Sequence, residues 1–326
     1  MSRNKIFTVI AALLCFISAL SSCGNYAVPP EESQFTTGII ETSATEKIDV
    51  LSTSATQPVQ PTTTIPQLEL PYHTAAALYC SDMGEFIYSE NIYNSIAPAS
   101  MTKLLTACVA LNYVDSSELC YVGSELQFVQ PYSSMCYISP GEILTMHDLI
   151  TGLLLSSGND AAYTIAVTTA RILNPDIYLS DSEAVEYFVE LMNQFAVSIG
   201  MTGSNFMNPD GWDNWSQYTT VSDLLILTQY AMNIWEIREI VGWSSQNVTI
   251  ASGEYFTWHN SNRLLDPYDV YYCPNAIGAK TGSTVNAGYC LIAAFVKDGH
   301  LYFTIVSGCD SDENRYEATL ELFGLC

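Results

Sequence analysis

The sequence predicts an α+β fold whose antiparallel sheet is built from strands near both ends of the folded domain. Apolar runs on either side of Met83-Gly84, and a second pair on either side of Asp298-Gly299, are typical of hairpins. Several stretches with helical periodicity lie between them. Because an isolated hairpin is only marginally stable, we expect the strands to join into one sheet, flanked by helices and carrying an inserted, mostly helical lobe.

Each element follows from a local pattern along the chain. The first two strands are expected over 75–80 and 85–93. A helix after Ser100 is predicted by apolar residues at three- and four-residue intervals, namely Leu104, Leu105, Cys108 and Leu111. A capping box formed by Thr145 and Asp148 predicts the start of the next helix.

The second half of the domain continues this pattern. One helix is expected to begin near Asn159, and two longer amphipathic helices are expected over 183–201 and 220–235. A long hairpin over 287–308 and a helix over 313–324 close the domain.

The composition indicates a packed, acidic protein. Of its 326 residues, 48% are hydrophobic, which is enough for a sizeable core, while 34 acidic residues against 10 Lys and Arg give a net charge of -24. Such a chain repels nucleic acid, so no nucleic-acid partner is expected. Only three lysines fall in the folded domain, Lys103, Lys280 and Lys297.

The N-terminus has the features of an export signal. Arg3 and Lys5 precede an apolar run over 6–20, which is short for a membrane span. The segment 20–23, LSSC, resembles the lipobox of bacterial lipoproteins, which predicts a signal peptide over 1–22 and a diacylated Cys23. The lipid would hold the protein on the outer face of the cytoplasmic membrane, facing the cell wall. The alternative is an ordinary secretory signal with an incidental cysteine.

Residues 23–70 are rich in Ser, Thr and Pro and are expected to form a disordered tether to a domain over 71–326.

The chain has ten cysteines, and eight remain when Cys15 in the signal and Cys23 are set aside. Export would permit disulfides among them but does not show any. Cys120 and Cys136, within one predicted insertion, are the pair to test first.

Ser100 and Lys103 form the first of three motifs that carry chemistry. Ser100 begins a helix, so its backbone N–H is free, and Lys103 lies one turn later on the same face. A serine hydroxyl needs a neighbouring base to become a nucleophile, and a lysine can be that base only where its ammonium is destabilised. The apolar helix around Lys103 would bury it, and Lys280 could add a second positive charge.

The second motif lies between two predicted helices, and the third lies before the predicted C-terminal hairpin. Ser157-Gly158-Asn159 could relay a proton and bind a substrate carbonyl, or could simply be a turn that caps a helix. Lys280-Thr281-Gly282 on a strand edge would bind a substrate carboxylate, with the Ser283 N–H as an oxyanion donor beside that of Ser100. A basic turn without function is the alternative. A phosphate loop is disfavoured because the glycine-rich motifs are missing.

From about Pro71 to Cys326 the sequence resembles the low-molecular-weight penicillin-binding proteins, the serine-type D-Ala-D-Ala carboxypeptidases of β-lactamase/transpeptidase-like fold. The matching segments include APASMTKLLTA, GLLLSSGNDAA, FMNPDGW, HNSNRLL and GAKTGSTVNAGYCLIAA. The resemblance implies an acyl-enzyme on Ser100, with Lys103 as base and Ser157 as relay. Substrate-binding residues would be Asn159, Lys280, Thr281, Gly282 and Ser283. The implied substrate is a peptidoglycan stem peptide ending in D-Ala-D-Ala, with β-lactams as inhibitors.

Several features bear on the alternatives. Known members carry a second, β-rich domain and a C-terminal anchor, neither of which follows the closing helix here; the lipobox is expected to replace the anchor. No cofactor or metal is expected, since the histidines lack zinc-ligand spacing. A serine β-lactamase and a non-catalytic binding lipoprotein remain alternatives. Glu190 resembles a deacylating glutamate only superficially and is expected to be a solvated helix residue. Arg315 is expected to be an ordinary surface residue; the alternative is that it adds positive potential for the substrate carboxylate.

Overall fold

The computed structural model describes residue 68 and residues 70–326, and Leu68–Cys326 forms one compact unit. The predictions for the signal peptide, for Cys23 and for nearly all of the tether lie outside the described residues. Within the described part, no helix is both long enough and apolar enough to cross a membrane.

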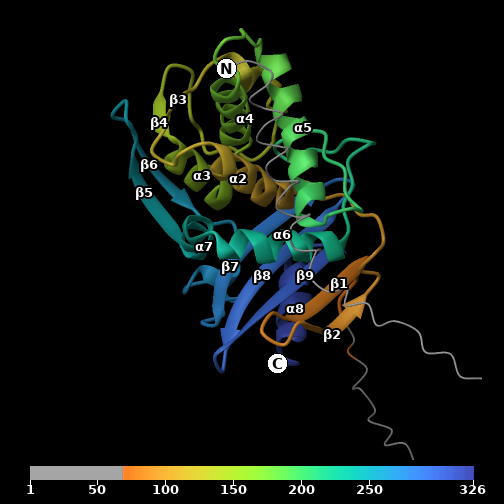
Figure 1. Cartoon of the computed structure of the whole chain (residues 1–326). Coiled ribbons are helices and arrows are strands. Elements are labelled where there is room, and N and C mark those ends of the chain that lie inside the picture. The colour runs from red at the N-terminus through yellow and green to blue at the C-terminus, as the bar shows by residue number, and fades with distance from the viewer. Residues whose placement is uncertain (1–67, 69) are drawn as a thin grey trace, which may run out of the picture. The chain divides into compact units, whose positions relative to one another are not determined.

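A five-stranded antiparallel sheet forms the centre of the domain (Figure 1). Its strands are β1 (Ala75–Cys80), β2 (Glu85–Glu90), β7 (Ala276–Thr284), β8 (Gly288–Lys297) and β9 (His300–Cys309). The order β2-β1-β9-β8-β7 pairs the first strand with the last, from Ala75 opposite Ser307 to Cys80 opposite Tyr302. The prediction that strands from both ends join into one sheet is therefore confirmed.

The remaining elements are helices, short 3₁₀ turns and two small hairpins. The helices are α2 (Thr102–Tyr113), α3 (Met146–Leu155), α4 (Asn159–Leu173), α5 (Asp181–Ile199), α6 (Val221–Asn233), α7 (Trp235–Gly242) and α8 (Asp312–Phe323). Short 3₁₀ turns are η1 (Ala99–Met101), η2 (Ser124–Phe128) and η3 (Arg263–Leu265). The small hairpins pair β3 (Leu119–Tyr121) with β4 (Ile143–Thr145), and β5 (Ser245–Thr249) with β6 (Tyr255–His259).

Alternation along the central strands creates two cores. Ala75 and Ala77 of β1 pack with the helical lobe, whereas Ala76 and Leu78 point to the opposite face and pack with Tyr316 of α8. Figure 1 shows α8 against the sheet, opposite the lobe that contains α2 to α5. Helices thus cover both faces of the sheet, which explains why its inner strands are apolar on both sides.

Local capping explains several helix starts. Thr145 and Asp148 form the predicted capping box at α3, and Ser180 with Glu183 forms another at α5. The expected helix over 220–235 corresponds to α6, which ends before Ile234, whose backbone is extended, and α7 follows as a helix that was not predicted. Both helices pack against the same core.

The cysteines correct one expectation. All eight cysteines in the described residues are free thiols, and the suggested Cys120–Cys136 pair is wrong. Cys120 contacts the backbone carbonyl of Glu118, whereas Cys136 contacts the carboxylate of Asp160, which lies on α4. The two thiols therefore have different environments although their positions are close in the sequence.

Candidate active site

Ser100 lies in η1, the 3₁₀ turn that leads into α2. The residue before it, Ala99, has a φ of +46°, a conformation that non-glycine residues rarely adopt. The loop between α5 and α6 packs tightly on this turn, because a Cβ at Gly211 would lie 1.9 Å from the carbonyl oxygen of Ala99. Close packing therefore holds the strained turn that presents Ser100.

Lys103 is fully buried and contacts Ser100 directly. Its Nζ donates hydrogen bonds to Ser100 Oγ at 2.8 Å and to the backbone carbonyl of Asp210 at 2.6 Å. Burial lowers the pKa of Lys103 from its usual 10.5 to about 8, while the charges of Asp210 and Asp160 oppose this shift. A substantial fraction of Lys103 is then a free amine at mildly alkaline pH, as a general base requires.

The second motif lies between α3 and α4. Ser157 is buried and has a φ of +57°, and Asn159 begins α4. The backbone N–H of Asn159 donates to the carbonyl of Ser134 at 2.8 Å. Asp160, next in sequence, accepts bonds from the backbone N–H groups of residues 136–138. The turn is thereby fixed to the loop that precedes residue 139.

The third motif lies on β7, an edge strand of the sheet. Lys280 is buried, and its pKa lies well below the usual value because of burial and the nearby charges of Lys103 and Arg315. The hydroxyl of Thr281 is 2.6 Å from that of Ser261. A Cβ at Gly282 would lie 3.2 Å from the backbone nitrogen of Ser100, so β7 runs close beside η1.

Residues of the first two motifs, and the residue that follows the third, line one cavity of about 140 Å³. Ser100 and Asn159 come from the motifs, Ser283 directly follows Gly282, and Tyr132 and Trp212 come from two loops. The predicted site residues are thus brought together: Ser100 and Lys103 by contact, Asn159 and Ser283 by the cavity, and Lys280, Thr281 and Gly282 by their position on β7. Ser157 lies two residues before Asn159.

Two further residues belong to this region: the sequence did not single out Asp210, and it favoured an ordinary surface position for Arg315. Asp210 lines the cavity and is 1% exposed; its segment, FMNPDGW, was noted only as part of a resemblance. Arg315 was expected on the surface, but it is 7% exposed and donates to the backbone carbonyls of Gly282 and Cys290 at 3.3 Å. It also pairs with Asp312 on the same helix, and its bond to the Gly282 carbonyl joins α8 to β7. No local pattern in α8 reveals a contact with β7.

Glu190 behaves as the sequence predicts. It is exposed on α5 and accepts a hydrogen bond from Gln194 at 3.0 Å. It does not line the cavity that contains Ser100, so it is no candidate for a base acting at that site.

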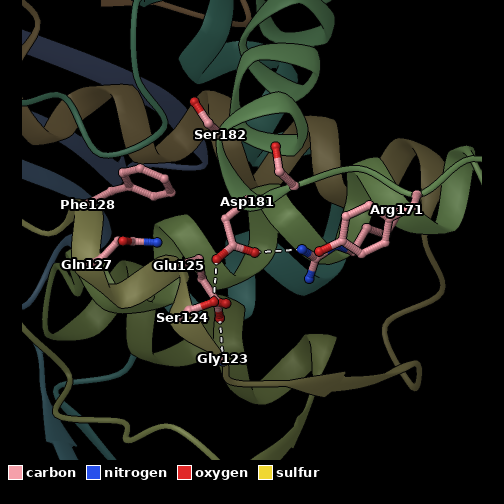
Figure 2. A pocket seen from close by; sticks show the side chains of 10 residues that line it. Gly123, Ser124, Glu125, Gln127, Phe128, Arg171, Asp181 and Ser182 are labelled. Atoms are coloured by element: carbon pink, nitrogen blue, oxygen red, sulfur yellow. Dashed lines mark hydrogen bonds and ion pairs between the residues drawn. The ribbon is translucent and has the colours of Figure 1, made fainter.

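A larger hollow, of about 630 Å³, lies between η2 and the start of α5 (Figure 2). Its charged groups are already paired. Arg171 forms an ion pair with Asp181 at 2.5 Å, and the same carboxylate accepts a bond from Ser124. Glu125 accepts from the backbone of Gly123 and from Thr164. None of the three motifs contributes to this hollow, so we do not assign it chemistry.

Comparison with known proteins decides the family. The family model described as D-alanyl-D-alanine carboxypeptidase, Peptidase S11, matches residues 71–311. The chain belongs to this family. A D-alanyl-D-alanine carboxypeptidase of a Streptomyces species is 30% identical over 66% of this chain and 74% of the relative. DacF of Bacillus subtilis is 28% identical over 74% of this chain.

The fold agrees with the family. The crystal structure of a Streptomyces DD-transpeptidase superposes with a TM-score of 0.70 at 25% identity, covering 79% of this chain and 98% of that one. The predicted α+β, β-lactamase/transpeptidase-like fold is therefore confirmed. The chain spans only 58% of the length of DacF and 57% of the length of another D-alanyl-D-alanine carboxypeptidase, DacC of Escherichia coli.

Proposed function

We propose that this D-alanyl-D-alanine carboxypeptidase family member is an active serine peptidase that removes the terminal D-alanine from peptidoglycan stem peptides. One observation carries the proposal: a buried lysine amine with a pKa of about 8 lies 2.8 Å from the Ser100 hydroxyl. A mere binding module would gain nothing from a desolvated base beside a serine, because burying a lysine costs stability.

Acylation uses the Ser100–Lys103 contact. Lys103 Nζ takes the proton of Ser100, and Oγ attacks the carbonyl carbon of the penultimate D-alanine. The backbone N–H groups of Ser100 and Ser283 face the oxygen on which negative charge develops. The peptide bond then breaks, and the leaving nitrogen receives a proton from Lys103 by way of the Ser157 hydroxyl. The product is an ester on Ser100, and the proton count balances.

Substrate binding uses the third motif and Asn159. The terminal carboxylate of the peptide would meet the Thr281 hydroxyl and the positive charges of Lys280 and Arg315. These cations are concentrated at one point of a chain whose net charge is -24. The amide of Asn159 would hold the backbone of the stem peptide, and the outer edge of β7 would align it.

Deacylation completes the reaction. Water hydrolyses the ester on Ser100, with Lys103 again as base.

The experiment that tests this function has two measurements. Purified 68–326 should release D-alanine from a peptide ending in D-Ala-D-Ala, and a fluorescent penicillin should label Ser100 for minutes or longer. Rapid turnover of penicillin without D-alanine release would instead identify a β-lactamase. Stable labelling without D-alanine release from any wall peptide would identify a binding protein. An adduct mapped to Ser157 would contradict the assignment of the nucleophile.

We also propose that the mature protein is held at the membrane by lipid on Cys23. The support is the lipobox-like segment 20–23 after a basic start and an apolar run. Two or more acyl chains give stable attachment where one does not. The folded domain would then act on peptidoglycan at the outer face of the cytoplasmic membrane.

A further inference from the structure

The side chain of Asp210 has no role in the mechanism above. It is 1% exposed, and one carboxyl oxygen accepts a hydrogen bond from the backbone N–H of Trp212 at 3.1 Å. The other oxygen, Oδ2, is buried without a hydrogen-bond partner in the described part of the chain. A buried carboxyl oxygen that lacks a partner is costly, so its presence in the catalytic cavity requires an explanation.

The backbone of Asp210 contacts the base directly. The carbonyl of Asp210 accepts a hydrogen bond from Lys103 Nζ at 2.6 Å. The following residue, Gly211, has a φ of +87° and no room for a side chain against Ala99. The loop that carries Asp210 is therefore in close contact with the turn that carries Ser100.

Charged groups face Lys103 from three other elements. Asp210 comes from the loop after α5, Asp160 from α4 and Lys280 from β7. Beyond them, Arg315 acts on Lys280, and the Tyr163 hydroxyl faces Asp210. These are the groups that can set the charge state of the base.

The two carboxylates near Lys103 differ in how they are satisfied. Asp160 accepts bonds from the N–H groups of Cys136, Tyr137, Ile138 and Ala161, which already compensate its charge. Asp210 accepts one such bond only. Burial raises the pKa of Asp210, and the positive charge of Lys103 opposes that rise. Asp210 is therefore the carboxylate whose charge depends most on the lysine.

We infer that Asp210 is the charge partner of Lys103, a positioning residue that stabilises the ammonium formed when Lys103 takes the Ser100 proton. The inference rests on the proposed function. The proton passes from Ser100 Oγ to Lys103 Nζ as Oγ bonds to the carbonyl carbon, and it later leaves with the departing nitrogen. The proton does not pass on to Asp210. A carboxylate stabilises the imidazolium of a Ser-His-Asp triad in the same way.

The test is the pH dependence of acylation in Asp210→Asn. The second-order rate constant for penicillin labelling would be measured from pH 5 to 10 in the variant and in the unaltered chain. Without the carboxylate, the Lys103 ammonium is less stable, so the pH of half-maximal rate on the acid side should fall by about one unit. The plateau should fall by up to about tenfold, because the base is weaker.

Asp213→Asn is the matched control in the same loop. Its carboxylate accepts bonds from the Thr284 hydroxyl at 2.6 Å and the Asn286 N–H at 3.1 Å, at the β7–β8 turn. This variant should leave the acid-side midpoint in place, whatever happens to the plateau. A midpoint that falls in both variants would overturn the inference, since any disturbance of the loop would then suffice.

An acid-side midpoint that stays or rises in Asp210→Asn would also overturn the inference, even if the plateau falls. If Asp210→Asn does not fold, Asp210→Ser takes its place, because its hydroxyl can still accept from Trp212, and the same criterion applies. If the unaltered chain is not acylated at any pH, the proposed function fails, and this inference fails with it. A midpoint shift confined to position 210 supports it.

Discussion

Lys103 shows the conflict between stability and chemistry at the scale of one residue. Removing its charge from water lowers the pKa from 10.5 to about 8, which corresponds to a cost of about 3 kcal/mol at neutral pH. Its contacts with Ser100 and with the Asp210 carbonyl recover only part of this. The protein retains a costly residue because an activated serine needs it.

Lys103→Met should therefore lose activity while keeping the fold. The apolar side chain fits a buried site, but it cannot accept the Ser100 proton, so penicillin acylation should slow by about 10²–10⁴-fold. Timed labelling of the purified domain measures this, with circular dichroism to confirm folding. Lys297→Met is the matched control, because Lys297 donates to the Cys326 carbonyl instead. Labelling of Lys103→Met at the unaltered rate would remove Lys103 from the mechanism.

Lys103→Met should also change how the stability of the protein depends on pH. The folded pKa of Lys103 is lower than the unfolded one, so between about pH 8 and 10.5 the unfolded state binds more protons. The contribution of Lys103 to the free energy of unfolding therefore rises with pH across this window. The free energy of unfolding of Lys103→Met, relative to that of the unaltered chain, should be highest below pH 8 and should fall progressively up to pH 10.5. Urea unfolding at several pH values measures this. A difference that does not change with pH would contradict it.

Residue patterns predicted the catalytic groups better than their surroundings. Ser100 and Lys103 share one helical turn, so their contact follows from local geometry. Asp210 and Arg315 reach the site only through the tertiary fold, from 107 residues beyond Lys103 in one case and 33 beyond Gly282 in the other. No local periodicity reports such contacts, so the acidic partner and the buried arginine were missed.

At the scale of elements, the turn η1 and the loop around Gly211 act as one unit. Gly211→Ala combines a left-handed backbone with a Cβ 1.9 Å from the Ala99 carbonyl oxygen, so the loop must shift. We expect the free energy of unfolding to fall by about 3 kcal/mol or more. Penicillin labelling should also slow, because the Asp210 carbonyl moves away from Lys103. Denaturant unfolding and timed labelling measure the two effects.

Gly141→Ala tests the effect of a left-handed backbone without a steric clash. Gly141 has a φ of +99°, but a Cβ there would meet nothing within 4 Å. This variant should cost only about 1 kcal/mol and should leave labelling unchanged. Equal losses in the two variants would show that the left-handed backbone alone matters, and that the packing of Gly211 on Ala99 does not position the site.

Elements with strong local signals were predicted, and those defined by tertiary contacts were not. The Thr145 capping box and the Asp298-Gly299 turn set α3 and the β8–β9 hairpin as expected. The β5–β6 hairpin was not predicted: its strands alternate only weakly, and each has a single buried residue, Val248 or Trp258. Trp258 is held by a hydrogen bond to the Cys136 carbonyl, 122 positions away.

At the scale of the whole molecule, the sheet explains how distant motifs meet. Joining β1 to β9 closes the chain on itself, and β7 at the edge then lies beside η1. This brings Gly282 next to Ser100, although 182 positions separate them in the sequence. The terminal strands could be predicted from their hairpin patterns, whereas the order β2-β1-β9-β8-β7 required the structure.

The proposed anchor gives the last prediction. Peptidoglycan is an immobile substrate outside the membrane, so an exported domain is most effective when retained beside it. In a bacterial host, the full chain should incorporate labelled palmitate and sediment with membranes. Cys23→Ala should abolish both, because only this cysteine follows the LSS segment. Cys326→Ala is the control, since its thiol lies in the folded domain. Palmitate incorporation that survives in Cys23→Ala would reject the lipobox. Loss of palmitate with unchanged sedimentation would show that the uncleaved apolar segment holds the protein instead.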